Sequence, residues 1–215
     1  MSFTDYTEGK VADEIFGATA FAAPGTLHVG LHSAYPNEAG SGAELSGNGY
    51  ARVAVTNNTT NWPNYSGGQK TNGNPINFPT ATGSNWLEAV AVSIWDASTS
   101  GNMIARGWLG SDPGKLFTAT AADLFTAPGH ALVNDDKVAV IAIPGGTLPT
   151  GVVEGTIYFV INVSGDTFNL SATQGGGAIN LTTVGAGLIK KVIPKTVQVG
   201  DTLSFPASSV VITLD

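Results

Sequence analysis

The chain of 215 residues contains no cysteine, few charged side chains and no long apolar run. Without cysteine, disulfide bonds, thiolate nucleophiles, iron–sulfur clusters and cysteine-based zinc sites are excluded. Because there are only three histidines, a His-rich metal site would require distant residues to come together. Apolar runs such as residues 138–143 are far shorter than the roughly 20 residues that span a bilayer, so we expect no membrane insertion.

Charge is sparse and mostly negative. Charged residues make up 12% of the chain, and 9 basic against 16 acidic side chains give a net charge of −7. This balance argues against nucleic acid and anionic lipid as main partners, because both bind clustered Lys and Arg. Asp5 lies where a secretory signal needs positive charge, so we expect synthesis and folding in a cytoplasm.

Glycine is abundant, and hydrophobic residues are frequent enough for a folded core. The 28 glycines are about twice the ordinary share of roughly 7%, which is untypical of a helical bundle. Hydrophobic residues account for 42% of the chain, which excludes a disordered chain. Short alternating segments separated by turn residues predict an all-β protein, an antiparallel β-sandwich or barrel-like domain.

A single helix is expected near the N-terminus. Asp5 and Glu8 have the spacing of a capping box, Val11 and Ile15 follow at helical spacing, and Gly17 ends the segment. A helix of about three turns with so narrow an apolar stripe is marginal alone. We therefore expect it to dock, either on its own sheet or on a neighbouring subunit.

The strongest strand pattern covers residues 87–95. Both of its faces are apolar, which is typical of a central strand. The turn at 96–101 predicts a hairpin with residues 102–109. Five further strands are expected in the same domain: 27–31, 50–56, 75–79, 202–205 and 209–214, the last followed only by Asp215.

Residues 115–191 differ in composition from their flanks. They contain no tryptophan, although the flanking segments contain all four. Strands are expected at 137–143, 156–162, 166–171 and 187–192. We interpret 115–191 as a small all-β module inserted in a surface hairpin of a discontinuous domain formed by 1–114 and 192–215.

Catalytic and cofactor-binding motifs are missing. The chain has no Gly-x-Ser-x-Gly, no phosphate loop and no complete Gly-x-Gly-x-x-Gly. His28 and His32 share one strand face roughly 13 Å apart, too far to bind one metal, so we place them on a polar face or at a subunit contact. Asp96, Asp135 and Asp136 are interpreted as solvated turn residues, and the scattered glutamates offer no glycosidase pair. We expect no enzyme activity, no metal and no cofactor.

Aromatic residues in polar surroundings are the candidate contact surface. Trp62 and Tyr65 lie in the Gly-rich stretch 57–74, and Trp86 follows a further loop. Such rings bury much area at low entropic cost and stack on sugars, which would fit a host surface glycan. Equally compatible with the sequence is a loop that folds back, with Trp62 covering the edge of its own sheet.

Three separated stretches together resemble the tailed-bacteriophage virion proteins described as tail-fibre proteins. They lie within 5–56 (including Thr26-Leu27-His28-Val29-Gly30-Leu31-His32), 76–97 (including Ile76-Asn77-Phe78-Pro79) and 199–215 (including Val199-Gly200-Asp201-Thr202-Leu203). The family pattern runs almost directly from near Leu109 to the Gly200-Asp201 turn, so 115–191 departs from it. That segment is similar to a small β module of phage structural proteins, through residues 129–132, 155–160 and 166–171.

The resemblance implies a non-enzymatic virion component present in many copies. We expect a tail-fibre or tail-tip protein that associates symmetrically with itself, most often as a trimer, and with other virion proteins, while displaying the inserted module outward. A head decoration protein is the alternative, and a glycan-binding host-recognition module is a further one.

Overall fold

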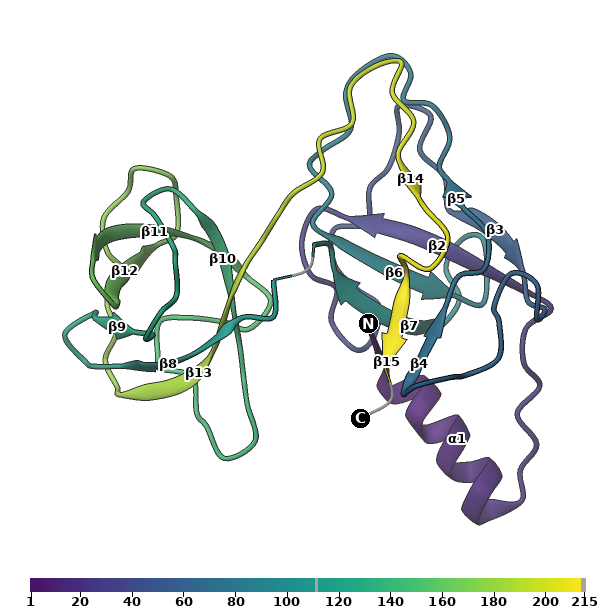
Figure 1. Ribbon diagram of the computed structural model, residues 1–215, viewed down its shortest axis with the longest axis horizontal. Helices are drawn as coiled ribbons and strands as arrows, with labels where there is room; N and C mark the ends of the chain where they lie inside the picture. The colour runs from purple at the N-terminus through teal and green to yellow at the C-terminus, as the bar shows by residue number, and fades with distance from the viewer. Residues whose placement is uncertain (111, 214–215) are drawn as a thin grey trace. The chain divides into compact units, whose positions relative to one another are not determined.

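The structure is a computed structural model that describes residues 1–110 and 112–213. The chain forms two compact units (Figure 1). Unit 1 comprises Met1–Leu109 and Pro194–Asp215, and unit 2 comprises Gly110–Ile193. Leu214 and Asp215, the end of the last expected strand, lie outside the described residues.

Unit 1 contains a five-stranded antiparallel sheet with the order β1-β7-β6-β2-β3. Its strands are β1 (Ser2–Phe3), β2 (Thr26–His32), β3 (Val53–Thr56), β6 (Ala91–Trp95) and β7 (Met103–Trp108). All five residues of β6 are buried, and β6 lies in the middle of the sheet. The central strand and its hairpin with β7 are therefore confirmed. The strand is shorter than expected, and Leu87 is 69% exposed.

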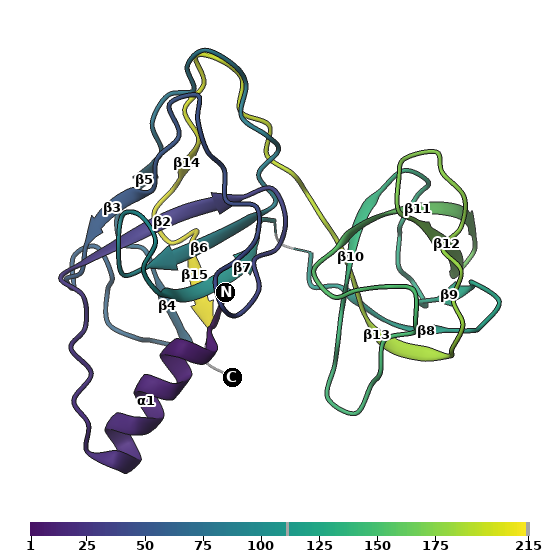
Figure 2. The ribbon, with the colours of Figure 1, turned by 180° about the vertical axis from the view of Figure 1, so that it is seen from behind.

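Two short strand pairs form the second layer of unit 1 (Figures 1 and 2). They are β4 (Gln69–Thr71) with β15 (Val211–Thr213), and β5 (Ile76–Asn77) with β14 (Ser204–Phe205). One core cluster joins Val29 and Ile94 of the sheet to Ile76 and Ile212 of these pairs. The side chains shared between the layers make unit 1 a β-sandwich.

Helix α1 (Asp5–Gly17) is attached to the sheet through its first turn. Thr4, not Asp5, is the N-cap residue, and its side chain makes no capping hydrogen bond. The Thr4 hydroxyl instead donates to the Met103 carbonyl, and the Thr7 hydroxyl donates to the Ile104 carbonyl at 2.9 Å. Ala18, with φ 54°, ends the helix. Thr7 is the only buried residue of α1, so docking on the domain's own sheet is confined to the N-terminal turn.

Among the described residues, no helix is long and apolar enough to cross a membrane.

Unit 2 is a closed six-stranded barrel with the order β10-β11-β12-β9-β8-β13. Its strands are β8 (Lys115–Ala119), β9 (Phe125–Thr126), β10 (Lys137–Ile141), β11 (Ile157–Ser164), β12 (Thr167–Ser171) and β13 (Gly185–Lys191). Phe125 stacks on Phe168 with ring centroids 5.6 Å apart, inside a core that belongs to unit 2 alone. Closure pairs both edges of every strand. Both units are built of antiparallel strands, which confirms the all-β fold class.

The two points where the chain leaves and re-enters unit 1 are close together. Leu109 N–H donates to the Val90 carbonyl at 2.9 Å. Lys195 exchanges two backbone hydrogen bonds with Ala89, at 2.8 and 2.9 Å. The residues at which the chain leaves and re-enters unit 1 are thus hydrogen-bonded to two consecutive residues of that unit, 90 and 89.

Candidate functional site

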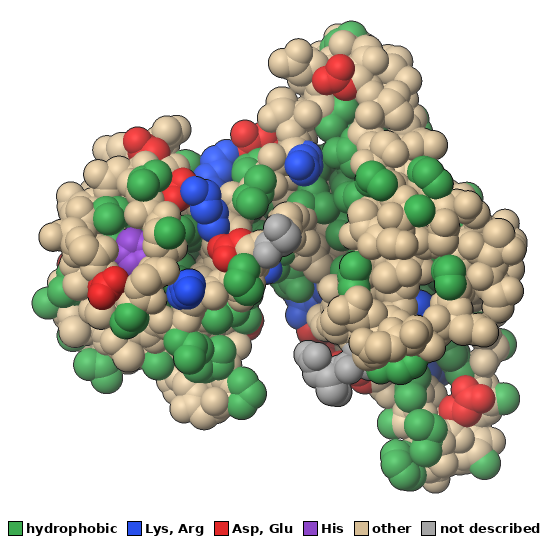
Figure 3. Space-filling model, in the orientation of Figure 1, with side chains coloured by type: hydrophobic (Ala, Val, Ile, Leu, Met, Phe, Trp, Pro, Cys, Tyr) green, Lys and Arg blue, Asp and Glu red, His purple; other side chains and the backbone are tan. Residues whose placement is uncertain are grey.

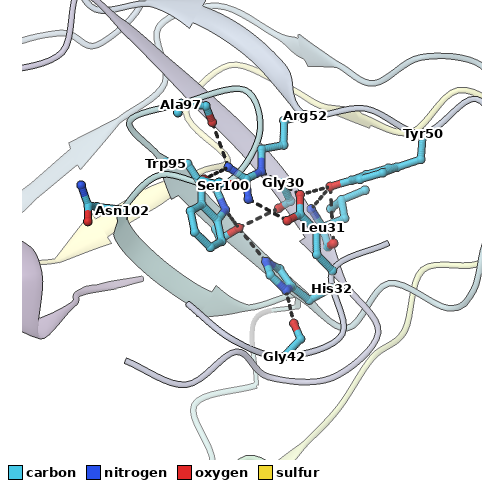
Figure 4. A network of polar contacts seen from close by, with 12 residues as sticks. Gly30, Leu31, His32, Gly42, Tyr50, Arg52, Trp95, Ala97, Ser100 and Asn102 are labelled. Atoms are coloured by element: carbon cyan, nitrogen blue, oxygen red, sulfur yellow. Dashed lines mark hydrogen bonds and ion pairs between the residues drawn. The ribbon is translucent and has the colours of Figure 1, made fainter. Parts of the chain in front are cut away.

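A buried polar network in unit 1 centres on His32 of β2 and Ser93 of β6 (Figure 4). Both residues are 0% exposed. His32 Nε2 lies 2.7 Å from Ser93 Oγ, and Nδ1 lies 2.8 Å from the Gly42 carbonyl oxygen. A carbonyl only accepts, so we assign the imidazole proton to Nδ1. Trp95 Nε1–H donates to Ser93 Oγ at 2.6 Å, and the Ser93 hydroxyl donates to His32 Nε2 at 2.7 Å in preference to the Gly30 carbonyl, which is 3.5 Å away. The network therefore holds a neutral imidazole.

This geometry resembles the serine–histidine pair of a hydrolase, but no substrate can reach it. A nucleophile has to meet its substrate, whereas the sheet and the 34–49 loop enclose Ser93 and His32 completely. Placing His32 on a polar face or at a subunit contact was wrong. It is a core residue that ties Gly42 of the loop to β6.

The second half of the network is an ion pair between Arg52 and Glu44. Arg52 donates from Nε and Nη2 to the two Glu44 carboxylate oxygens at 2.8 and 2.7 Å. Its Nη1 donates to the Ala97 and Ser100 carbonyls, both at 2.8 Å, in the β6–β7 turn. The guanidinium lies 3.7 Å from the centroid of the Trp95 ring. One side chain thus connects the 34–49 loop, the turn and the sheet.

Burial and pairing set the protonation states in the network. Burial lowers the pKa of His32, and the hydrogen bond to the Gly42 carbonyl only partly opposes this effect. Burial alone would raise the pKa of Glu44, but the hydrogen bonds and charge of Arg52 outweigh it, so this pKa lies below its usual value. Burial also raises the pKa of the Tyr50 phenol, which donates to Glu44 at 3.1 Å.

The sequence offers two signals for this network, neither of which belongs to a known motif. Gly30 lies between His28 and His32 on one face of β2, and a Cβ there would meet Glu44 Oε1 and Ser93 Oγ, each at 3.1 Å. Arg52, placed among apolar residues ahead of β3, is the other unusual position. The distant partners of both residues become visible only once the loop is folded onto the sheet.

We expect unit 1 to lose stability as the pH falls from about 7.5 to about 5.5. The folded state holds His32 neutral, with a pKa below its ordinary 6.5. Below 6.5 the unfolded chain binds a proton that the folded chain does not, so the free energy of unfolding decreases by up to about 1.4 kcal/mol per pH unit. The lowered pKa of Glu44 also contributes to stability, but this contribution is lost only as the pH falls below 4.5, the ordinary pKa of a glutamate, which is outside this pH range.

Urea unfolding followed by tryptophan fluorescence measures this dependence, because all four tryptophans belong to unit 1. His32→Asn should be less stable throughout and should lose the slope in this pH range. Equal slopes for both proteins would show that His32 is not the responsible group.

The three candidate contact residues do not form one exposed surface. Trp86 is 5% exposed, donates from Nε1 to the Asn48 carbonyl at 2.9 Å, and packs edge-on against Tyr50. Trp62 is 2% exposed and belongs to the core cluster. Only Tyr65, at 52% exposure, offers a ring to a partner. The two indole rings present no open face on which a sugar could stack.

An apolar pocket of about 370 Å³ lies in unit 1 beside the first half of α1. Trp62 and Tyr65 line it, together with Val11 of the helix and Phe21 of the segment that follows the helix. Among the described residues that line it, Lys70 is the only charged one.

The free half of α1 is the other unusual surface of unit 1. Ile15 is 66% and Phe16 88% exposed, and apolar side chains gather over this part of the molecule (Figure 3). Both residues border a second hollow of about 460 Å³ with Ser2, Phe3 and Thr213. Exposed apolar patches of this kind are typical of interaction surfaces.

No group of three or more His, Cys, Asp or Glu side chains that could bind a metal occurs in the described part of the chain. Asp96 is occupied within its turn, where its carboxylate accepts from the backbone and side chain of Asn102, both at 2.7 Å. Asp136 forms an ion pair with Lys191 at 2.7 Å.

A comparison with protein families identifies the family of this chain. The family described as Podophage GP4 fiber I protein gp80 matches residues 2–127, which is more than half of the chain. The match includes β1 to β9 and therefore extends into the first strands of unit 2. It does not include residues 199–215, the third stretch on which the resemblance rested. No curated protein matches the chain. The chain belongs to the Podophage GP4 fiber I protein gp80 family of phage fibre proteins.

Proposed function

We propose that this protein is a non-enzymatic component of a phage tail fibre or tail tip, made in the cytoplasm of the bacterial host and assembled by symmetric association. Membership in a family of phage fibre proteins carries the proposal. The protein associates with copies of itself, as a trimer, and with other virion proteins. The barrel of unit 2 serves as a displayed module.

Two features of the structure support a mechanical role. The serine–histidine pair of unit 1 is fully enclosed and acts as a structural link between loop and sheet. Apolar side chains at Ile15 and Phe16 remain exposed, as expected for a subunit that buries surface on assembly. Glycan binding is not part of the proposal, because Trp62 and Trp86 are buried.

Quantitative mass spectrometry of purified virions tests the placement. For a fibre or tail-tip component we expect a few to about a dozen copies per particle, the number that a small symmetric assembly supplies. Copy numbers in the hundreds would instead assign the protein to the head as a decoration protein. Absence from purified virions would refute a structural role in the particle.

A further inference from the structure

We propose that the tip of α1, residues 13–16, docks in the apolar pocket of a second copy of this chain. The inference rests on the proposed symmetric association and identifies the surfaces that carry it. The contact joins two different patches, the tip of one copy and the pocket of the next. If every copy makes this contact, the copies form a closed ring, or a dimer in which each copy inserts its tip into the other.

The pocket has one charged group without a counter-charge. Among the described residues that line it, Lys70 alone is charged, and it forms no ion pair within the described part of the chain. The other lining side chains are mostly apolar. An occupant that combines apolar side chains with negative charge would fit the site.

The tip of α1 has this combination. Ile15 and Phe16 are the apolar side chains, and Asp13 and Glu14 precede them. The last turn of α1 contains no basic residue. Since the C-terminal end of a helix carries partial negative charge, acidic residues there are unfavourable and a nearby cation is stabilising. Lys70 of a second copy supplies this cation.

The pocket is not filled by the tip of its own copy. Val11 is the last α1 residue that lines the pocket, and Phe16 lies five residues further along the helix. That separation is about 7 Å along the axis of a rigid helix. Ile15 and Phe16 border the second hollow instead. At about 370 Å³, the pocket is near the lower end of the range of roughly 300–1,000 Å³ for ligand sites, which suits one or two inserted side chains.

Disulfide trapping tests the contact directly, because the chain has no cysteine of its own. Copies carrying Phe16→Cys are mixed with differently tagged copies carrying Tyr65→Cys, at the pocket. We expect the disulfide between Phe16→Cys and Tyr65→Cys copies to form about tenfold faster than the disulfide between Val184→Cys and Tyr65→Cys copies. Val184 is a matched control, since it is 73% exposed and lies in unit 2. Equal rates would overturn the proposal.

Charge exchange provides the second test. Lys70→Glu and Asp13→Lys should each weaken self-association about fivefold, as measured by sedimentation equilibrium. The two changes combined in one chain should restore it, while an unchanged unfolding midpoint confirms the fold. Single variants without effect, or a double variant without recovery, would overturn the contact. If the charge exchange fails but purified virions contain the protein, only the proposed contact is refuted. If the protein is absent from virions, the proposed fibre function is refuted.

Discussion

Replacing Arg52 by leucine is expected to lower the free energy of unfolding of unit 1 by about 3 kcal/mol, because it leaves a largely buried carboxylate without its counter-charge. The Arg52 side chain is 6% exposed and that of Glu44 26%. The change also removes the donors to the Ala97 and Ser100 carbonyls. Tryptophan fluorescence during urea unfolding reports this loss from unit 1 alone, since unit 2 contains no tryptophan.

Two controls separate the buried charge from other effects. Arg106→Leu, also in unit 1, breaks the ion pair with Glu38, whose side chain is more exposed, at 38%, and should cost less, about 1 kcal/mol. Adding Glu44→Gln to Arg52→Leu removes the uncompensated charge, so part of the lost stability should return. If Arg52→Leu costs no more than Arg106→Leu, the buried pair does not stabilise unit 1 more than an exposed pair does.

The fold class was predictable because local patterns carry it. The apolar faces of residues 87–95 indicated a central strand, of which 91–95 form β6, and the 96–101 turn indicated a hairpin. The helix was recognised from Val11 and Ile15, although its N-cap was misplaced by one residue. Thr4 is held by the Met103 carbonyl across the sheet, and a contact between residues so distant leaves no local pattern.

The polar network could not be predicted for the same reason. Its members come from β2, the 34–49 loop, the segment before β3, β6 and the β6–β7 turn. Nothing in the spacing of His28 and His32 indicates that His32 meets Ser93, a residue 61 positions away. The polarity of the His32 side chain suggested that it lies on an exposed face. A polar side chain can also be buried, provided that its hydrogen bonds are satisfied, as those of His32 are.

The aromatic residues show how a loop's composition can mislead. A Gly-rich polar segment around Trp62 favoured an exposed contact surface and a covered sheet edge equally. The structure places the indole of Trp62 in the core cluster, with Asn58 at the start of its turn accepting from the Trp62 backbone N–H at 2.8 Å. Large rings dominate core energetics even where their sequence neighbours are polar.

Removal of unit 2 is expected to leave unit 1 folded, with a cooperative unfolding transition and a midpoint within several degrees of the full chain. We propose that unit 2 is an independently folding insertion, since each unit has its own core cluster. Leu109 and Lys195 bond to consecutive residues of one segment, Val90 and Ala89. Each backbone lies one strand spacing from that segment, so at most about 10 Å separates them, and three or four Gly and Ser residues replacing 110–193 can bridge this distance.

The matched control is a longer deletion that also removes Leu109 and Lys195, and with them the hydrogen bonds to Val90 and Ala89. It should unfold at a clearly lower temperature, because residues 89 and 90 lose their backbone partners. Residues 110–193 alone should show a β-type far-ultraviolet spectrum and cooperative melting, because closure of the barrel leaves no strand edge that depends on unit 1. A non-cooperative transition in the shorter deletion, or an unfolded isolated barrel, would mean that the two cores stabilise each other and that residues 110–193 do not fold independently of unit 1.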